Sequence, residues 1–186
     1  MMLSARDASL QVQVGDLLAC SGSSEVSKLI RLVSPTYSHV ALICSDRPAM
    51  VAESTASSSL PDSEDGMFRV GVQVHLLADW LAAYDGTVHL LQLRTPLAPI
   101  TEEAFQTWIE LEHRHNVGYD FAGVMRLGVE RVKRMIGAPQ FGSLFCSEMA
   151  AEAYKAIGLL TDVVPSECTP DDASQWPLFR DPVQLK

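Results

Sequence analysis

The sequence predicts an α+β fold built on an antiparallel sheet. Short apolar stretches that are typical of strands dominate the first half of the chain, and segments with apolar residues at helical spacing dominate the second half. The connection between the predicted strands 39–44 and 50–53 is too short for a parallel crossover, which needs roughly a dozen residues, so these two strands are expected to be antiparallel. Because the chain has 186 residues and shows no internal repeat, we expect a single domain over residues 1–186.

The first half alternates short strands with two short helices. Gly15 precedes the first apolar stretch, Ser23 or Ser24 can cap the first helix, and Pro35 ends it. Each strand is bounded by polar residues or by Gly and Pro. The predicted strands are 16–19, 39–44, 50–53, 70–74 and 87–94, and the predicted helices are the capped segment before Pro35 and residues 76–84.

The second half is predicted to be mainly helical. Thr101 caps one helix, and Glu102 and Glu103 occupy its first turn, where the helix dipole favours acids. Residues 119–135 are predicted to form a further helix, and another is predicted around Cys146. The tail from Thr161 on contains four prolines, so we expect it to be mostly irregular.

Residues 54–67 form a polar, serine-rich segment between two predicted strands. Such a composition buries little apolar surface, so we expect a mobile loop. Because the segment directly follows Glu53, we expect it to flank any site that contains this residue. A functional lid and plain disorder are both consistent with the sequence.

The net charge of −9 and the lack of Lys/Arg runs argue against nucleic acid and anionic membranes as partners. No apolar run reaches the roughly 18 residues that a transmembrane helix needs, so we expect no stable membrane insertion. The N-terminus lacks the pattern of a secretory signal. We therefore expect a cytoplasmic protein, with export by a route that the sequence does not show as the alternative.

The chain has four cysteines, Cys20, Cys44, Cys146 and Cys168, and none belongs to a C-x-x-C pair. This spacing gives no support to a zinc ribbon or a dithiol redox motif. Three of the four lie in strand-like or irregular segments, and we expect them to serve packing as free thiols.

Cys146 differs from the others because it lies in the first turn of a predicted helix. Ser143 can cap this helix, and Gly158 ends it. The N–H groups at a helix N-terminus favour a thiolate and can stabilise an oxyanion. Several alanines would let the helix pack closely on a sheet. A buried cysteine that only fills space is the alternative that the sequence leaves open.

His39 and Glu53 are candidate partners for this thiol. His39 opens an apolar strand, where its imidazole could accept the thiol proton. Glu53 ends the next strand, and antiparallel pairing would bring it beside His39. A carboxylate there would hold the imidazole in one tautomer. A core histidine and a solvated strand end are the alternative interpretations.

The remaining histidines show no pattern of a metal site. His113 and His115 lie near a helix end, but residues two apart do not face the same way, so we expect a solvated helix face. His75 and His89 have no evident partner. Motifs of phosphate loops, zincins and serine hydrolases are absent from the sequence, and we expect no metal and no cofactor.

Four segments together resemble the YiiX-like family. Residues 15–43 resemble its opening, with Gly-Asp before one strand and Ser-His-Val at the start of another. Residues 145–159 (FCSEMAAEAYKAIGL) resemble its nucleophile helix. VGYDF at 117–121 resembles a Tyr-Asp motif that precedes this helix, and ECTPDD at 167–172 resembles an element near the C-terminus of the family.

The YiiX-like family is a circularly permuted branch of the NlpC-type papain-like cysteine hydrolases. Its histidine precedes its cysteine, as in this chain. The resemblance implies a papain-like fold in which an antiparallel sheet packs against the helix that bears the nucleophile. It also implies Cys146 as the nucleophile, His39 as the base and Glu53 as the third member of a triad.

The resemblance further implies that Tyr119 lines the site and supports the oxyanion. Ser38 and Ser147 adjoin the histidine and the cysteine in these motifs, and we assign them to substrate binding together with Tyr119. The Ser-rich loop and the missing export signal are departures from the family pattern.

We therefore predict a thiol-dependent hydrolase that cleaves an amide bond in a small peptide or amide substrate. By analogy with the wider superfamily, a short cell-wall-type peptide is the expected substrate. One alternative is acyl transfer or lipid hydrolysis of the kind found in lecithin:retinol acyltransferase-like proteins, which share the permuted order. Another is a catalytically silent binding module. The sequence makes no prediction about the oligomeric state.

Overall fold

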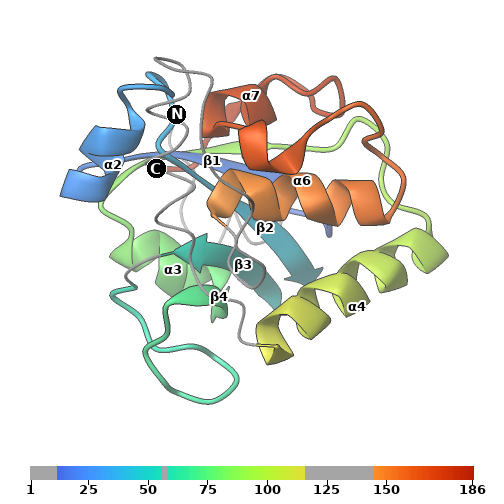
Figure 1. Cartoon of the computed structure of the whole chain (residues 1–186). Coiled ribbons are helices and arrows are strands. Elements are labelled where there is room, and N and C mark those ends of the chain that lie inside the picture. Colours follow the sequence, from blue (N-terminus) through green and yellow to red (C-terminus); the bar gives the residue numbers. More distant parts are fainter. Residues whose placement is uncertain (1–11, 56–57, 116–144) are drawn as a thin grey trace.

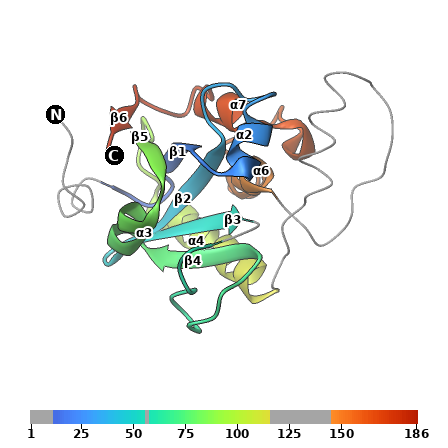
Figure 2. The same cartoon turned by 90° about the vertical axis from the view of Figure 1, so that its left-hand side faces the viewer.

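A computed structural model describes residues 12–55, 58–115 and 145–186. Its centre is a six-stranded antiparallel sheet with the strand order β4-β3-β2-β1-β5-β6. Figure 1 labels β1 to β4, and Figure 2 labels all six strands. The strands are β1 (Leu17–Gly22), β2 (His39–Asp46), β3 (Ala49–Thr55), β4 (Gly71–Leu76), β5 (Gly86–Leu91) and β6 (Val183–Gln184). The helices of the described residues are α2 (Glu25–Ile30), α3 (Leu77–Ala83), α4 (Pro99–Arg114), α6 (Cys146–Ala156) and α7 (Pro170–Ser174), with a 3-10 helix, η1 (Pro165–Glu167).

Helices cover both faces of the sheet. One face packs against α4, α6 and α7 through side chains that include Leu17, Val40 and Leu42. The opposite face packs against α3 through side chains that include Leu18 and Ile43 (Figure 2). Successive strand residues point to opposite faces, so a strand with a core on both sides needs apolar residues at every position. This explains why the central strands read as continuous apolar runs in the sequence.

The α6 helix lies against the central strands β2 and β3. Its small residues Ala150, Ala151 and Ala153 are fully buried, so the backbone of the helix comes close to the sheet. Tyr154 is also fully buried, and its hydroxyl donates to the carbonyl of Gly15 at 2.8 Å. This close packing brings the first residue of α6 to the start of β2.

The predicted α+β class and antiparallel sheet are confirmed, and each predicted strand is present with its ends shifted by a few residues. The predicted cap at Thr101 is wrong, because α4 already begins at Pro99. A proline fits the first turn of a helix, where an N–H has no partner in any case. The helix predicted over 119–135 and the cap predicted at Ser143 lie outside the described residues.

The C-terminal tail is mostly irregular, as predicted, but it contains three short regular elements, η1, α7 and β6. Thr169 caps α7 in a capping box, in which its hydroxyl accepts the N–H of Asp172 and the Asp172 carboxylate accepts the N–H of Thr169. Val183–Gln184 adds an edge strand beside β5. Pro165 and Pro170 stand at helix starts, where they are tolerated.

Candidate active site

Cys146 is the first residue of α6, in agreement with its predicted place in a first helical turn. The preceding residue, Phe145, is extended, and its carbonyl accepts the N–H of Met149 at 2.9 Å. The earlier amides of the first turn have no intrahelical carbonyl to bind. Cys146 is only 3% exposed. The position thus combines a shielded thiol with N–H donors that favour a thiolate or an oxyanion.

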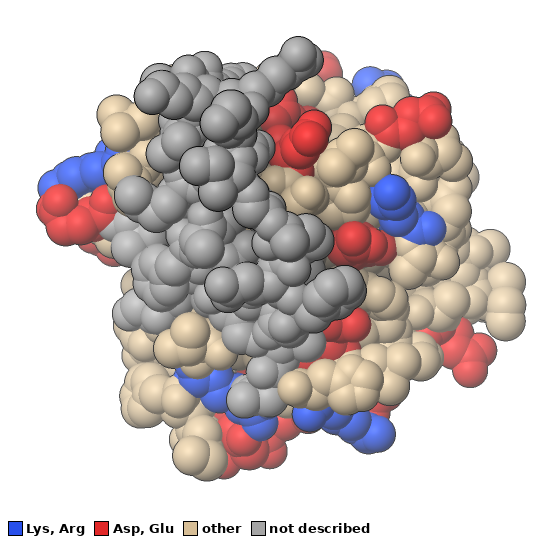
Figure 3. Space-filling view, in the orientation of Figure 1, with Lys and Arg blue, Asp and Glu red and all other residues tan. Residues whose placement is uncertain are grey.

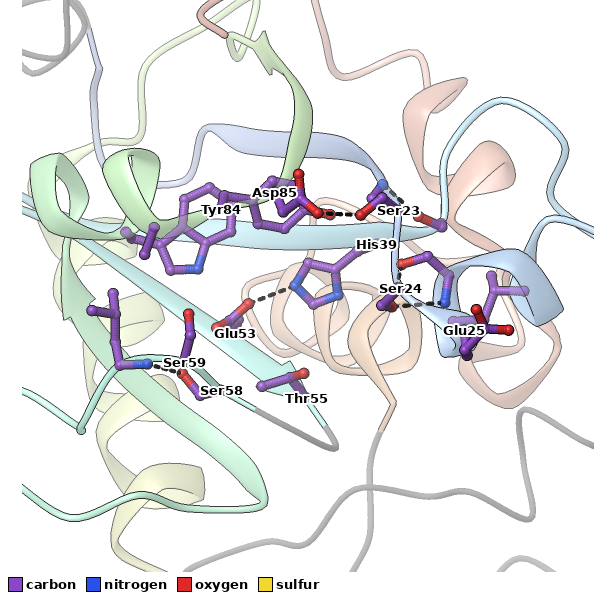
Figure 4. Close-up of a pocket in the computed structure, with 17 residues that line it drawn as sticks. Ser23, Ser24, Glu25, His39, Glu53, Thr55, Ser58, Ser59, Tyr84 and Asp85 are labelled. Atoms are coloured by element: carbon purple, nitrogen blue, oxygen red, sulfur yellow. Dashed lines mark hydrogen bonds and ion pairs between the residues drawn. The ribbon is translucent and has the colours of Figure 1, made fainter.

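His39 and Glu53 form a close pair beside Cys146. His39 begins β2, Glu53 lies near the end of β3, and the antiparallel pairing of these strands brings both side chains together. His39 Nε2 lies 2.6 Å from Glu53 Oε2 (Figure 4). The Cys146 side chain is also close enough to the His39 ring to raise the pKa of the imidazole. Since Nε2 is occupied by Glu53, Nδ1 is the ring nitrogen left for the thiol.

The electrostatics of this cluster favour an imidazolium between a sulfur and a carboxylate. Burial alone would lower the pKa of His39, but Cys146 and then Glu53 outweigh burial and raise this pKa from 6.5 to about 10. Burial alone would raise the pKa of Glu53. Hydrogen bonds from His39 and Trp80, together with the nearby charges of His39 and His75, instead hold it below its usual value.

A cavity of about 490 Å³ opens beside His39. His39 and Glu53 line it together with Trp80 and Tyr84 (Figure 4). Much of the remaining wall carries hydroxyl groups, from Ser23, Ser24, Ser27, Ser38, Thr55, Ser58 and Ser59. No Lys or Arg of the described residues lines this cavity. Cys146 is not among the lining residues, so the thiol is linked to the cavity through its contact with His39.

Tyr84 is a cavity residue that the sequence analysis missed. Its ring is stacked with that of His39, with 6.4 Å between centroids and 18° between planes. A Cβ at Gly22 would come within 3.0 Å of the Tyr84 hydroxyl, so the glycine leaves room for this group. The hydroxyl also forms a hydrogen bond with Cys20. Only the sheet topology brings the end of α3 beside β2. No local pattern in the sequence therefore predicts Tyr84 as a residue of the site.

The three residues assigned to substrate binding have different positions. Ser38 lies on the cavity wall, but it is buried and its hydroxyl already accepts the N–H of Gly22 at 3.0 Å. Ser147 is fully buried and donates to the carbonyl of Cys168 at 2.7 Å, which makes it a structural neighbour of the thiol and not a cavity residue. Tyr119 lies outside the described residues.

Asp171, in the Thr-Pro-Asp-Asp element, connects the tail to the segment that precedes His39. Its carboxylate accepts the N–H of Thr36 at 3.0 Å and the N–H of Tyr37 at 2.7 Å. Its own N–H donates to the hydroxyl of Ser34 at 2.9 Å. With the bond from Ser147 to Cys168, the tail therefore contacts the elements that carry both the imidazole and the thiol.

A second buried pair joins the predicted loop to α4. His113 Nε2 lies 2.8 Å from Asp62 Oδ2, and both side chains are nearly inaccessible to solvent. The expectation of a solvated face at His113 is therefore wrong, because the segment that contains Asp62 covers it. Ser54 and Thr55 belong to β3 and not to the predicted loop, and residues 56–57 lie outside the description. Ser58 and Ser59, in contrast, line the cavity.

The other three cysteines have the environment of packing residues. All four cysteines are free thiols, in agreement with the sequence prediction. Burial raises the pKa of Cys44 and of Cys168 to about 12, and burial together with the charge of Glu53 raises that of Cys20 well above its usual range. These thiols stay protonated near neutral pH.

The described surface carries charges of both signs. On the face shown in Figure 3, acidic and basic side chains are interspersed, and the described residues form no continuous basic patch there. Within the described ranges, no helix combines the length and the apolar character that a membrane crossing requires.

The fold and the site together define an α+β protein in which a thiol, an imidazole and a carboxylate meet beside a cavity. No family model matches the chain, and no curated protein matches it. Among solved structures, the metalloprotein YiiX from Escherichia coli O157:H7 is similar, with a TM-score of 0.55 and 18% sequence identity. The match covers 81% of this chain and 68% of YiiX. This likeness shows a YiiX-like fold.

Proposed function

We propose that this protein is a cysteine hydrolase that cleaves an amide bond with Cys146, His39 and Glu53. The observation that carries the proposal is the double contact of His39. Its Nε2 lies 2.6 Å from the Glu53 carboxylate, while the Cys146 thiol is close enough to the same ring to raise its pKa. A thiol nucleophile needs this arrangement of a base that is itself oriented by a third group. The class proposed is the permuted NlpC-type branch of the papain-like hydrolases.

In the proposed reaction, the Cys146 thiolate attacks the substrate carbonyl and forms a C–S bond, while the carbonyl oxygen takes the negative charge. The N–H groups at the start of α6 stabilise this oxyanion. The C–N bond then breaks, and the amine leaves with a proton from His39. Water attacks the thioester while His39 accepts one of its protons. Breaking the C–S bond releases a carboxylic acid and restores the thiolate–imidazolium pair.

The cavity supports a small, polar substrate. Its volume of about 490 Å³ falls in the range of small-molecule sites, and its hydroxyl-rich wall offers both donors and acceptors. A peptide amide has complementary N–H and C=O groups, so a short peptide is the proposed substrate class. Its cell-wall origin is proposed from the sequence resemblance alone.

The YiiX structure is described as that of a metalloprotein. Within residues 12–55, 58–115 and 145–186, no three or more His, Cys, Asp or Glu side chains are grouped as metal ligands. A structural or catalytic zinc site uses at least three protein ligands. The described residues therefore do not fit such a site, and the proposed reaction contains no metal step.

The proposal is tested by the reactivity of the thiols. Limited iodoacetamide at neutral pH, followed by mass-spectrometric mapping, should label Cys146 before Cys20, Cys44 and Cys168, which serve as internal controls. His39→Gln should reduce the Cys146 rate and leave the other three unchanged. Labelling of Cys146 no faster than that of the buried thiols would favour a silent binding module instead.

Substrate class is tested separately with a panel of peptide p-nitroanilides and p-nitrophenyl acyl esters. Hydrolysis of peptide anilides by the wild type, and its loss in Cys146→Ala, is the expected result. Turnover confined to long-chain acyl esters would contradict peptide hydrolysis and favour the lipid-directed alternative.

A further inference from the structure

A second histidine, His75, faces the same carboxylate as His39. His75 lies on β4 and is 1% exposed. Its Nε2 lies 3.6 Å from Glu53 Oε1 and 3.2 Å from Gln73 Oε1. Two of its partners are not marked by the local sequence, because Glu53 comes from β3 and Pro61 from the segment that follows β3. The imidazole is therefore part of the environment of Glu53.

The other nitrogen of His75 contacts the segment that forms one wall of the cavity. His75 Nδ1 lies 3.2 Å from the carbonyl oxygen of Pro61. A carbonyl only accepts hydrogen bonds, so Nδ1 carries the hydrogen of this contact. Glu53 Oε1 and Gln73 Oε1 are acceptors as well, so the contacts through Nε2 are those of a ring that carries a hydrogen on both nitrogens. The preceding residue, Leu60, lines the cavity, as do Ser58 and Ser59. The following residue, Asp62, accepts the N–H of Val74 from the same strand as His75 at 2.9 Å.

The Glu53 carboxylate has more than one orienting partner. Oε2 contacts His39 at 2.6 Å, the carboxylate accepts a hydrogen bond from Trp80, and Oε1 faces His75. Partners on different sides of a planar carboxylate restrict its rotation, so that Oε2 stays directed at His39. A shift of His75 therefore changes the orientation of the group that holds the imidazole.

We propose that His75 is a positioning residue that couples the cavity wall at residues 58–61 to the orientation of Glu53. The proposal rests on the proposed function, because Glu53 acts on His39 and through it on Cys146. One ring contacts both ends of this connection, the Pro61 carbonyl through Nδ1 and the Glu53 carboxylate through Nε2. A substrate that moves the Ser58–Leu60 wall would thereby alter the orientation of the triad.

Two substitutions of His75 test the contacts of its two ring nitrogens separately. His75→Asn places an amide nitrogen near the position of Nδ1, so it keeps the Pro61 contact and loses the Glu53 contact. His75→Gln places its amide nitrogen near the position of Nε2 and does the reverse. The first readout is the downfield proton resonance of the His39–Glu53 hydrogen bond, which is assigned by its loss in Glu53→Gln. The second readout is amide hydrogen exchange at Asp62 and Ser63.

We expect His75→Asn to shift or abolish the downfield resonance and to leave exchange at Asp62 and Ser63 unchanged. We expect His75→Gln to preserve the resonance and to accelerate this exchange by about five- to tenfold, the effect of losing one ordinary hydrogen bond. His75→Asn should also slow alkylation of Cys146 several-fold, whereas His75→Gln should not.

Identical behaviour of the two variants would overturn the proposal, because a purely structural histidine does not distinguish its two nitrogens in this way. A wild-type protein without the downfield resonance would overturn it as well. Neither readout requires a reactive thiol. If Cys146 proves unreactive, the proposed function fails. The downfield resonance and the amide exchange still test the coupling through His75 in that case.

Discussion

Two buried histidine–carboxylate pairs of the described residues have similar geometry and different surroundings. His39–Glu53 and His113–Asp62 are separated by 2.6 and 2.8 Å, and the carboxylate of each pair is nearly inaccessible. The ring of His39 also contacts a thiol and lines a cavity. His113 lies on α4, and its second nitrogen faces Glu64 at 3.3 Å.

The carboxylates also differ in what else they bind. Asp62 accepts the backbone N–H groups of Val74 and Glu64, so its hydrogen bonds fasten one chain segment to another. Glu53 is bound by side chains, those of His39 and Trp80. The comparison teaches that a buried His–carboxylate pair does not by itself mark a catalytic site. The two pairs are distinguished by the group at the second ring nitrogen, which is the Cys146 thiol for His39 and the Glu64 carboxylate for His113.

The largest expected difference between the pairs is in turnover. Glu53→Gln should lower the rate of hydrolysis of a peptide p-nitroanilide by roughly one to three orders of magnitude, because the amide orients His39 without stabilising its charge. Asp62→Asn should change this rate by less than about threefold, since Asp62 contacts neither His39 nor Cys146. Equal losses in the two variants would remove the distinction between the pairs.

The reverse order is expected for stability. Asp62→Asn should lower the free energy of unfolding by about 1–3 kcal/mol, because the new NH₂ group faces donors and leaves buried groups unpaired. Asp65→Asn is the matched control, because Asp65 belongs to the same segment and is exposed. Urea unfolding measures both variants. A midpoint for Asp62→Asn as high as that of the control would show that the buried pair does not hold this segment.

The pH dependence of stability should identify the His39 pair. The folded-state pKa of His39 is raised to about 10 from an ordinary 6.5, so its stabilisation is complete below pH 6.5 and is lost as the pH rises toward 10. Between pH 6.5 and 8, where the other thiols remain protonated, the free energy of unfolding should fall by at most about 1.4 kcal/mol per unit. The fall is smaller to the extent that Cys146 is ionised in the folded protein, because a thiolate binds one proton fewer than the thiol of the unfolded chain. His39→Gln should remove this slope. A slope of the same size in His39→Gln would assign it to another group.

The smallest effect is expected from the tail. Asp171→Asn removes one acceptor from the two bonds that hold Thr36 and Tyr37, so alkylation of Cys146 should slow by about two- to fivefold, equivalent to roughly 0.4–1 kcal/mol. Asp172→Asn is the control, because Asp172 belongs to the capping box of α7 and does not contact this segment. Its alkylation rate should match the wild type. A slower rate in both variants would indicate a general loosening of the tail.

The sequence alone determined the features that depend on local patterns. Short continuous apolar runs predicted the strands. The helix predicted around Cys146 placed this residue correctly at the start of α6. The placement of His39 beside Glu53 could also be predicted from the sequence, because their two strands are joined by a short connection. A short turn between antiparallel strands allows few pairing registers, so the contacts between two such strands can be predicted from the sequence.

The tertiary structure alone decided the contacts that cross between distant segments. His113 pairs with Asp62 across 51 positions of the chain, and Tyr84 is stacked with His39 although it follows α3, far from β2 in the sequence. Ser147 adjoins the thiol in the sequence, yet packing on Cys168 buries it away from the cavity. Burial and hydrogen-bond partners follow from how the layers pack, and local spacing carries no information about elements that meet only after the chain has folded.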